Sequence, residues 1–412
     1  MYHIGIAVYT FLFRLVAFFH PKADKMVKGH KQTWKQLSNG IKLKKSWIWF
    51  HAASLGEFEQ GRPIIERLRV EHPEYAVLLT FYSPSGYEVR KNYEGVDLVC
   101  YLPFDRKKNV TRFIRIVRPK MAFFIKYEFW PNYLQELNKN KIPTFLISGI
   151  FRKDQAFFKP YLLSYRKLLS YFTHFFVQNE ESASLLASIG YTDNVTVSGD
   201  TRYDRVLEIA SDSKQLEKVA YFKEASESAT VLVAGSTWSQ DETLLIPYFN
   251  SHPDLKLIIA PHEINESHLA QIESLLLRPY ARYSTITPDQ ASKVDCLIID
   301  GFGLLSSIYR YGDMAYIGGG FGTGIHNTLE AAVYGIPVIF GPKCEKFIEA
   351  KGLIDTGGGL CVDSALSLIE ALNTLLSDSA IRISRGKSAG EMVKKGSGGS
   401  RIILDSLFKK SH

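Results

Sequence analysis

The chain has few cysteines and lacks the spacings that hold a metal or a disulfide framework. Its four cysteines, Cys100, Cys296, Cys344 and Cys361, are scattered over 412 residues without a C-x-x-C pair. This usage fits reduced thiols in a cytoplasm better than disulfides or a zinc site. No two aspartates are separated by a single residue, so the D-x-D pattern that holds Mg²⁺ beside a diphosphate is missing. The sequence therefore predicts neither a metal site nor a cofactor.

The apolar run at the start of the chain is too short to cross a bilayer as a helix. Residues 4–19 are apolar except for Thr10 and Arg14, whereas about 20 residues are needed to span. A signal peptide carries its positive charge before such a run, but here the lysines follow it. We expect residues 1–21 to form a membrane-anchor helix whose neighbouring lysines face anionic headgroups. The alternative is an N-terminal helix packed on the first domain.

Outside this leader the chain has no excess of either charge. Residues 1–46 contain nine Lys or Arg and only Asp24 as an acid, which accounts for the whole net charge of +8. A nucleic-acid-binding protein would carry its basic residues on the folded body. The neutral body therefore argues against nucleic-acid binding.

Short apolar runs alternate with amphipathic segments of helical length from residue 46 onward. The runs are 46–51, 76–81, 96–102, 121–125, 143–148, 174–177 and 195–199, and then 229–235, 255–261, 295–300, 314–318 and 337–341. This alternation predicts an α/β protein with two Rossmann-like, doubly wound, mainly parallel sheets facing a cleft. We expect domains at 22–205 and 229–412, a linker at 206–228, and a last helix that could cross back to the first domain.

A glycine-dense stretch, residues 311–342, combines two of these strands with a turn and a helix expected from about His326 to Tyr334. The N–H groups of such a helix make an anion site beside the turn. The glycines do not match G-x-G-x-x-G, so dinucleotide binding is not supported. His326, Asn327 and Glu330 fall on one turn, where a carboxylate could hold ribose hydroxyls. A purely structural βα turn is the alternative.

Polar residues also follow the first strand and the fourth. In HAASLGE, Ser54 and Gly56 form a turn and Glu57 opens a helix, a position that ordinarily favours the ionised carboxylate. An ionised carboxylate in a cleft is what a general base needs, although a carboxylate placed only for the helix dipole is the alternative. Lys126 and Glu128 stand two apart after the fourth strand. In the second domain, Gly235, Ser236 and Thr237 precede a capped helix and form a second candidate anion site.

Seven motifs occur in order along nearly the whole chain. They are HAASLGE, YSPSGYE, YLPFD, YEFWPN, GSTW, GFGLLSSIYRYGDMAYIGGGF and HNTLEAAVYGIPVIFGP. Together they resemble the 3-deoxy-D-manno-octulosonic acid (Kdo) transferases of glycosyltransferase family 30. The resemblance implies a GT-B fold and transfer of Kdo from CMP-Kdo to the glucosamine disaccharide of a lipid A precursor (lipid IVA). It also implies a place on the cytoplasmic side of the cell inner membrane.

The resemblance also assigns roles to residues of this chain. It gives the acidic base to Glu57 and the acceptor side to Ser54, Gly56 and Glu128. The CMP contacts fall on Pro261, His262, Gly303, Leu304, Leu305, Asn327, Thr328, Leu329 and Glu330. Secondary candidates for the donor or its phosphate are Gly235, Ser236, Thr237, Arg202 and His326.

Four positions depart from the family's pattern. His262 replaces the usual Arg, Leu304 a frequent Glu, Lys126 an acidic residue, and Ile325 a Gly. A charge contact to the CMP phosphate could then come from Arg202, Lys343 or Lys346. One direct displacement with Glu57 as base would invert the anomeric configuration and need no metal. The alternatives are another GT-B glycosyltransferase using a UDP-sugar, or a non-catalytic membrane-surface binding protein.

Overall fold

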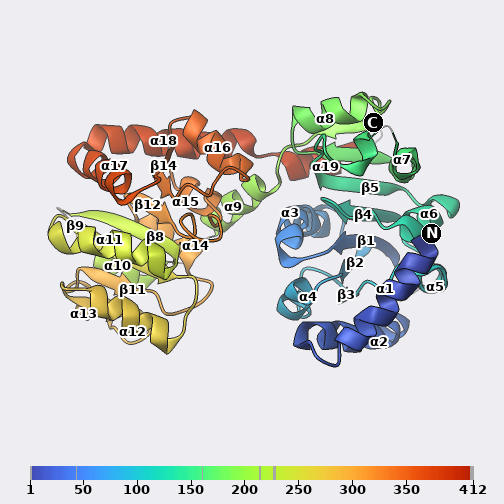
Figure 1. Ribbon diagram of the computed structural model, residues 1–412, viewed down its shortest axis with the longest axis horizontal. Helices are drawn as coiled ribbons and strands as arrows, with labels where there is room; N and C mark the ends of the chain where they lie inside the picture. Colours follow the sequence, from blue (N-terminus) through green and yellow to red (C-terminus); the bar gives the residue numbers. More distant parts are fainter. Residues whose placement is uncertain (1, 43, 160, 213–214, 226–228, 409–412) are drawn as a thin grey trace. The chain divides into compact units, whose positions relative to one another are not determined.

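The computed structural model describes residues 2–42, 44–159, 161–212, 215–225 and 229–408, and the chain divides into two compact units (Figure 1). Unit 1 comprises Met1–Arg205 and Ser397–His412, and unit 2 comprises Val206–Gly396. Each unit is built on one seven-stranded sheet in which every pairing is parallel. The expected α/β class with two doubly wound sheets is thereby confirmed.

The sheet of unit 1 has the strand order β3-β2-β1-β4-β5-β6-β7. Its strands are β1 (Ser46–Ala52), β2 (Tyr75–Phe81), β3 (Leu98–Tyr101), β4 (Met121–Ile125), β5 (Thr144–Gly149), β6 (His174–Val177) and β7 (Val195–Val197). Its helices are α1 (Tyr2–Val16), α2 (Pro21–Gly40), α3 (Leu55–Glu71), α4 (Pro84–Arg90), α5 (Lys107–Val117), α6 (Pro131–Lys139), η1 (Ala156–Phe158), α7 (Leu163–Leu169), α8 (Glu180–Ala187), α9 (Arg202–Ser211, which runs into unit 2) and α19 (Gly399–Leu407).

Both faces of this sheet are buried, which explains why its strands are continuous apolar runs. Along β1, Trp47 and Trp49 belong to one core cluster, whereas Ile48 and Phe50 belong to a second cluster. Successive side chains of a strand point to opposite faces, so each strand must be apolar at every position.

The sheet of unit 2 has the strand order β10-β11-β9-β8-β12-β13-β14. Its strands are β8 (Thr230–Thr237), β9 (Leu255–Pro261), β10 (Tyr280–Arg282), β11 (Cys296–Ile298), β12 (Met314–Ile317), β13 (Val338–Phe340) and β14 (Gly359–Cys361). Its helices are α10 (Glu217–Glu224), α11 (Ser239–Ser251), α12 (Glu266–Leu275), α13 (Pro288–Ala291), α14 (Leu305–Ile308), η2 (Tyr309–Tyr311), α15 (Leu329–Ala332), α16 (Ile348–Asp355), α17 (Ala365–Ser377) and α18 (Ser379–Gly396).

All twelve expected strands are present, and two more were missed. β10 and β14 each have three residues and lie at the two edges of the sheet of unit 2. An edge strand this short is held by backbone pairing with one neighbour and needs no apolar run of its own.

The C-terminal segment of the chain belongs to unit 1, together with the N-terminal half. The last helix expected from the sequence is broken at Gly398, which has a φ of 103°, so that α18 ends before it and α19 follows it. Asp204 accepts hydrogen bonds from the backbone N–H groups of Gly398 and Ser400, and α19 packs against α3 in unit 1.

Part of the segment expected as a linker forms α10, which buries Val219 and Phe222 and packs against α13.

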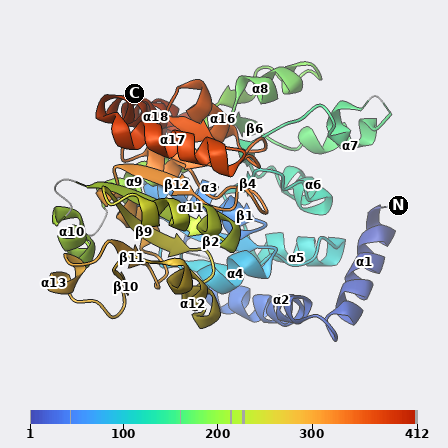
Figure 2. The same cartoon turned by 60° about the vertical axis from the view of Figure 1, so that its left-hand side comes forward.

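At the other end of unit 1, α1 and α2 meet at a sharp bend (Figure 2). Among the described residues, no single helix has both the length and the apolar character needed to cross a membrane. α1 and α2 pass that test only as a pair, which is bent by 117°. Tyr2 at the start of α1 donates a 2.6 Å hydrogen bond to the buried carboxylate of Asp105, so α1 is attached to the folded body.

Candidate functional site

In unit 1 the winding of the sheet changes direction between β1 and β4. The chain runs outward from β1 to β2 and β3, and then returns to place β4 on the other side of β1. Loops leaving neighbouring strands at such a switch point diverge and leave room for a ligand. The loop after β1 carries Ser54 and leads into the first turn of α3, which carries Gly56 and Glu57. The loop after β4 carries Lys126 and Glu128, so the structure brings these residues to one edge of the sheet.

Glu57 lies in the first turn of α3 and folds back on the residue that precedes the helix. Its Oε2 accepts hydrogen bonds from the backbone N–H of Ser54 at 2.9 Å and from Ser54 Oγ at 3.3 Å. Such a position should favour the ionised form. Burial, followed by the negative charge of Glu128, nevertheless raises the pKa of Glu57, against the lowering effect of the hydrogen bonds. The result is a more basic carboxylate than the helix end alone would give.

Glu128 is held by two aromatic side chains that the sequence analysis did not single out. Its Oε2 lies 3.1 Å from Nε2 of His51 and accepts a 2.6 Å hydrogen bond from Nε1 of Trp130. His51 is fully buried, and its Nδ1 lies 2.9 Å from Oγ1 of Thr80. The sequence did offer a way to find these two residues, because His51 lies in the motif HAASLGE and Trp130 lies in the motif YEFWPN.

Cationic and phenolic groups lie around the same edge. Arg152 Nη2 donates a 3.3 Å hydrogen bond to the hydroxyl of Tyr127, and the ammonium of Lys126 lies 5.6 Å from the centre of the Tyr127 ring. Burial raises the pKa of Tyr127, Arg152 lowers it and Glu57 raises it, so these charges interact with one another. Lys126 has a φ of 67°, a left-handed conformation that is uncommon outside glycine and recurs at functional sites.

Gly56 is exposed in the first turn of α3, and a Cβ atom built there would meet nothing within 4 Å. No packing contact inside the described protein therefore requires glycine at this position. A ligand that approaches the backbone closely would provide a reason.

In unit 2 the switch point lies between β8 and β12. β8 pairs with β9 on one side and with β12 on the other, so the loops after these three strands lie side by side. Three rings from these loops form a stack: Trp238 and His262 have centroids 4.7 Å apart, and His262 and His326 have centroids 4.3 Å apart. Trp238 Nε1 also donates a 3.3 Å hydrogen bond to His326 Nε2. Burial, then the neighbouring His262, lowers the pKa of His326, which keeps the ring neutral.

Asp241 fixes the glycine-rich turn to the loop after β8. Its buried carboxylate accepts hydrogen bonds from the hydroxyl of Tyr316 at 2.7 Å and from the backbone N–H groups of Gly319 and Trp238, both at 2.9 Å. Gly318 permits this close approach, because a Cβ atom there would lie 2.3 Å from the carbonyl oxygen of Ser236. Asp241 was not among the site residues predicted from the sequence, although its position in the first turn of α11 is that of a helix-end carboxylate.

The helix after the glycine-rich turn is shorter than expected. It covers only Leu329–Ala332 instead of about His326 to Tyr334, because the Oδ1 of Asn327 accepts the backbone N–H of Leu329 at 3.2 Å and starts the helix there. A single turn adds little dipole, so anion binding here depends on individual N–H groups. Asn327 Nδ2 also donates a 3.0 Å hydrogen bond to Glu330 Oε1. Thr328 is fully buried, and its hydroxyl has no hydrogen-bond partner among the described residues.

The remaining candidates lie as follows. Pro261 ends β9, and the backbone N–H of His262 donates to Thr237 at the end of β8. Gly303 is exposed with a φ of 78°, Leu304 precedes α14, and Leu305 lies beside Gly235 of β8. Ser236 has a φ of 53° within a bulge of β8. Arg202 belongs to unit 1, whereas the other donor candidates belong to unit 2, and its guanidinium is paired with Asp200 at 2.6 Å.

Lys343 and Lys346 are two lysines that could supply the positive charge of the family's usual arginine, which is His262 in this chain. Lys343 donates a hydrogen bond to the carbonyl of Gly322 and so helps to hold the glycine-rich turn. Lys346 is exposed and makes no hydrogen bond or ion pair with any residue that the structure describes. Over the described ranges, no three His, Cys, Asp or Glu side chains are grouped so that they could hold a metal ion.

Comparison with known proteins identifies relatives for both the sequence and the fold. Residues 26–205 match a family model described as 3-Deoxy-D-manno-octulosonic-acid transferase (kdotransferase). The chain is 28% identical over 345 residues to a 3-deoxy-D-manno-octulosonic acid transferase of Aquifex aeolicus, with 82% of this chain and 88% of the relative covered. It is also 24% identical over 380 residues to a bifunctional glycosyltransferase/methyltransferase of Fusobacterium nucleatum, with 89% of this chain covered. In that case the chain spans only 57% of the relative's length.

Among solved structures, a UDP-GlcNAc 2-epimerase from Neisseria meningitidis, bound to UDP-GlcNAc, is similar over 89% of this chain and 100% of its own. The TM-score is 0.58 and the sequence identity is 15%. At this identity the likeness shows the fold alone, and it agrees with the expected GT-B type of α/β architecture.

Proposed function

Because the chain belongs to the family of Kdo transferases, glycosyltransferases of lipopolysaccharide biosynthesis, we propose that it moves Kdo from CMP-Kdo to the glucosamine disaccharide of a lipid A precursor. The reaction proposed is one direct, metal-independent displacement that inverts the anomeric carbon. CMP-Kdo is a co-substrate in this account, and no cofactor takes part.

The proposed general base is Glu57. The observation that supports this role is the raised pKa of Glu57. Its position at the start of a helix would by itself lower that pKa and make the carboxylate less basic. A base works best when its pKa approaches the operating pH, because it is then ionised and still a good proton acceptor. Glu57 takes the proton of a primary hydroxyl of the acceptor as that oxygen bonds to the anomeric carbon of Kdo, and the bond to CMP breaks.

Glu128 acts as a positioning residue for this base. Its carboxylate is fixed by His51 and Trp130, and its charge is one cause of the raised pKa of Glu57. The nearby cations Lys126 and Arg152 suit an acceptor that carries negative charge. The open space over Gly56 lets the sugar ring come close to the start of α3.

The donor is proposed to bind at the carboxyl ends of β8, β9 and β12. His326 accepts the N–H of Trp238 at Nε2, so its proton sits on Nδ1 and can be donated to a phosphate oxygen. The sugar donor, CMP-Kdo, has a single phosphate. Uncharged hydrogen-bond donors together with one cation, such as Lys346, are therefore sufficient to bind it, and no divalent metal is required. Asn327, Thr328 and Glu330 supply hydrogen-bonding groups for the ribose.

A direct assay tests the proposal. The purified full chain is incubated with CMP-Kdo and a lipid A precursor, and the product is weighed by mass spectrometry with and without a chelator. We expect a mass increase of one or more Kdo units that a chelator does not reduce and that CMP inhibits more strongly than UDP. Inhibition by UDP but not by CMP would instead indicate a UDP-sugar glycosyltransferase, and no transfer with any donor would indicate a non-catalytic binding protein.

The location proposed for this reaction is the cytoplasmic side of the cell inner membrane, with α1 as the anchor. The lipid character of the acceptor requires the enzyme to work at a membrane surface. Many apolar side chains of α1 are exposed, which supports contact with lipid.

A further inference from the structure

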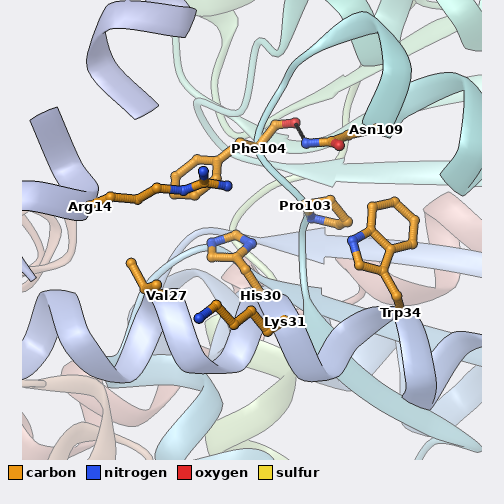
Figure 3. A pocket seen from close by; sticks show the side chains of 8 residues that line it. All are labelled: Arg14, Val27, His30, Lys31, Trp34, Pro103, Phe104 and Asn109. Carbon is orange, nitrogen blue, oxygen red and sulfur yellow. Dashed lines mark hydrogen bonds between the residues drawn. The ribbon is translucent and has the colours of Figure 1, made fainter. Parts of the chain in front are cut away.

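Unit 1 contains a cavity of about 130 Å³ between α1, α2 and the segment that follows β3 (Figure 3). None of the residues that line it lies in the segments 54–57 or 126–130, which carry Glu57 and Glu128. Its lining includes Arg14 of α1, His30, Lys31 and Trp34 of α2, and Phe104 and Asn109. We call it the α1–α2 pocket.

His30 is the polar group at the centre of this pocket. It is only 8% exposed, and neither ring nitrogen has a hydrogen-bond partner among the described residues. The ring stacks on Phe104 with a centroid distance of 4.2 Å and an interplanar angle of 19°. Burial, then the nearby Arg14, lowers the pKa of His30 to about 4, so the ring is neutral at neutral pH and has one N–H to donate. A buried polar group without a partner costs stability and calls for an explanation such as a ligand.

Two cations flank the ring without being neutralised. In Figure 3 the guanidinium of Arg14 lies above the His30 ring and the side chain of Lys31 runs beneath it, and both residues line the pocket. Both are exposed, and neither forms a hydrogen bond or ion pair with any described residue. The acids closest in the sequence are already engaged. Asp24 pairs with Lys28 at 2.6 Å, and Asp105 accepts hydrogen bonds from Tyr2, Asn132 and Tyr133. The pocket therefore favours an anion.

The outer face of α1 indicates where that anion comes from. One side of α1 is fixed to unit 1 by the hydrogen bond from Tyr2 and by the contact of Phe13 with Phe104. Large apolar side chains on α1 and just after it are nonetheless exposed: Ile4, Val8, Phe11, Leu12, Leu15, Val16, Phe18 and Phe19. An apolar helix face beside a row of basic residues is the arrangement of a helix that lies in a membrane surface.

We propose that the α1–α2 pocket binds the phosphate group of an anionic lipid headgroup while the exposed face of α1 lies among the acyl chains. The N–H of His30 donates to a phosphate oxygen, and Arg14 and Lys31 neutralise the charge. This lipid is neither the sugar donor nor the acceptor, so the inference goes beyond the proposed function.

The first test replaces His30 by Phe. His30→Phe removes both nitrogens, keeps a ring against Phe104 and leaves the net charge at neutral pH unchanged. Binding of the full chain to vesicles of phosphatidylcholine with phosphatidylglycerol should weaken about fivefold or more, while its Tm should not fall, because an unsatisfied buried group has been removed. Binding as tight as that of the unsubstituted protein would overturn the proposal. If His30→Phe does not fold, His30→Leu, which is also uncharged and has no hydrogen-bonding group, provides the same comparison.

A matched pair of lysines separates the pocket from diffuse attraction. Lys31→Ser and Lys35→Ser each remove one exposed positive charge from α2, but only Lys31 lines the pocket. We expect Lys31→Ser to weaken binding to these vesicles more than Lys35→Ser, and the difference to persist at raised salt. Equal effects of the two substitutions would contradict a specific pocket.

A third arm distinguishes a lipid headgroup from free phosphate. The imidazole resonances of His30 are followed by NMR in the full chain with phosphatidylglycerol bilayer discs and, separately, with inorganic phosphate at the same phosphate concentration. A shift with the discs alone supports the proposal, and an equal shift with inorganic phosphate overturns the lipid assignment. His30→Phe should retain turnover on a detergent-solubilised acceptor, so failure of this inference is distinct from failure of the proposed function.

Discussion

His51 Nε2 lies 3.1 Å from Glu128 Oε2, and both residues are buried. A carboxylate buried beside a histidine keeps a fixed position and a fixed hydrogen-bond pattern. Through its charge it also raises the pKa of Glu57. The pKa of the proposed base is therefore set in part by the charge of Glu128, whose position is fixed by His51. Neither of these two residues takes the proton of the acceptor in the proposed reaction.

The first prediction concerns this tuning. Glu128→Gln removes a negative charge and should lower the pKa of Glu57, because one of the two causes that raise it is lost. The acidic limb of the pH profile of kcat should move to lower pH. Trp130→Phe, which keeps the charge of Glu128, is the control and should leave that limb in place. A limb that does not move in Glu128→Gln would show that Glu128 does not act on the base.

The second prediction concerns stability. The folded-state pKa of Glu57 is raised above its unfolded value, so Glu57 contributes stability below the unfolded pKa that is lost as pH rises through the folded pKa. A neutral Gln at this position does not suffer that loss. Glu57→Gln should therefore be at least as stable as the unsubstituted protein at neutral pH and should lose this advantage in acid. Urea unfolding at the two pH values measures both, and a large loss at neutral pH would mean that the ionised carboxylate is needed for folding.

The third prediction compares two glycines. Gly318→Ala places a Cβ atom 2.3 Å from the carbonyl oxygen of Ser236 and should cost about 1–3 kcal/mol of unfolding free energy. Gly56→Ala meets nothing within 4 Å and should leave stability nearly unchanged while raising the KM for the acceptor. Thermal unfolding and steady-state kinetics separate the two effects. An unchanged acceptor KM in Gly56→Ala would remove Gly56 from the acceptor side.

The fourth prediction concerns the buried Thr328 hydroxyl. Thr328→Val removes a hydroxyl that has no partner among the described residues, so the folded protein should lose no stability. If this hydroxyl bonds the donor, the KM for CMP-Kdo should rise about tenfold while kcat changes little, the effect of one lost hydrogen bond. Asn327→Ala and Glu330→Ala should also raise this KM. An unchanged KM in all three variants would place the ribose elsewhere.

The fifth prediction concerns Asp241. Asp241→Asn leaves only one acceptor oxygen for the three donors that now bond to the carboxylate, and should destabilise unit 2 by about 1–3 kcal/mol. Donor binding should weaken with it, because the turn at Gly319 is released. Asp289→Asn, on an exposed position of α13, is the matched control and should change neither property. Equal behaviour of the two variants would contradict the role given to Asp241.

The periodicity of the sequence was sufficient to predict both sheets, because strands buried on two faces must be apolar throughout. It could not reveal β10 and β14, which are edge strands of three residues. The helix at Asn327 was predicted too long, because its start is set by a side-chain hydrogen bond and not by apolar spacing. Strand ends correctly indicated where polar residues gather within each unit.

Contacts between residues far apart in the sequence were beyond any local pattern. His51 and Glu128 are 77 positions apart, and Trp238 and His326 are 88 positions apart. The same is true of Cys344 and Cys361, which looked unrelated in the sequence but have sulfur atoms 3.6 Å apart. The orphaned nitrogens of His30 also needed coordinates, because only the packing of α1 and α2 shows that no partner reaches them.

The most direct test of the account is the turnover of Glu57→Gln, measured together with its affinity for CMP by calorimetry. Gln keeps the size of the side chain and a group that can accept the N–H of Ser54, but it cannot take a proton. We predict that kcat falls by ~10²–10⁴, the usual contribution of a general base, while the affinity for CMP is unchanged. Near-normal turnover with intact CMP binding would contradict the assignment of Glu57 as the base.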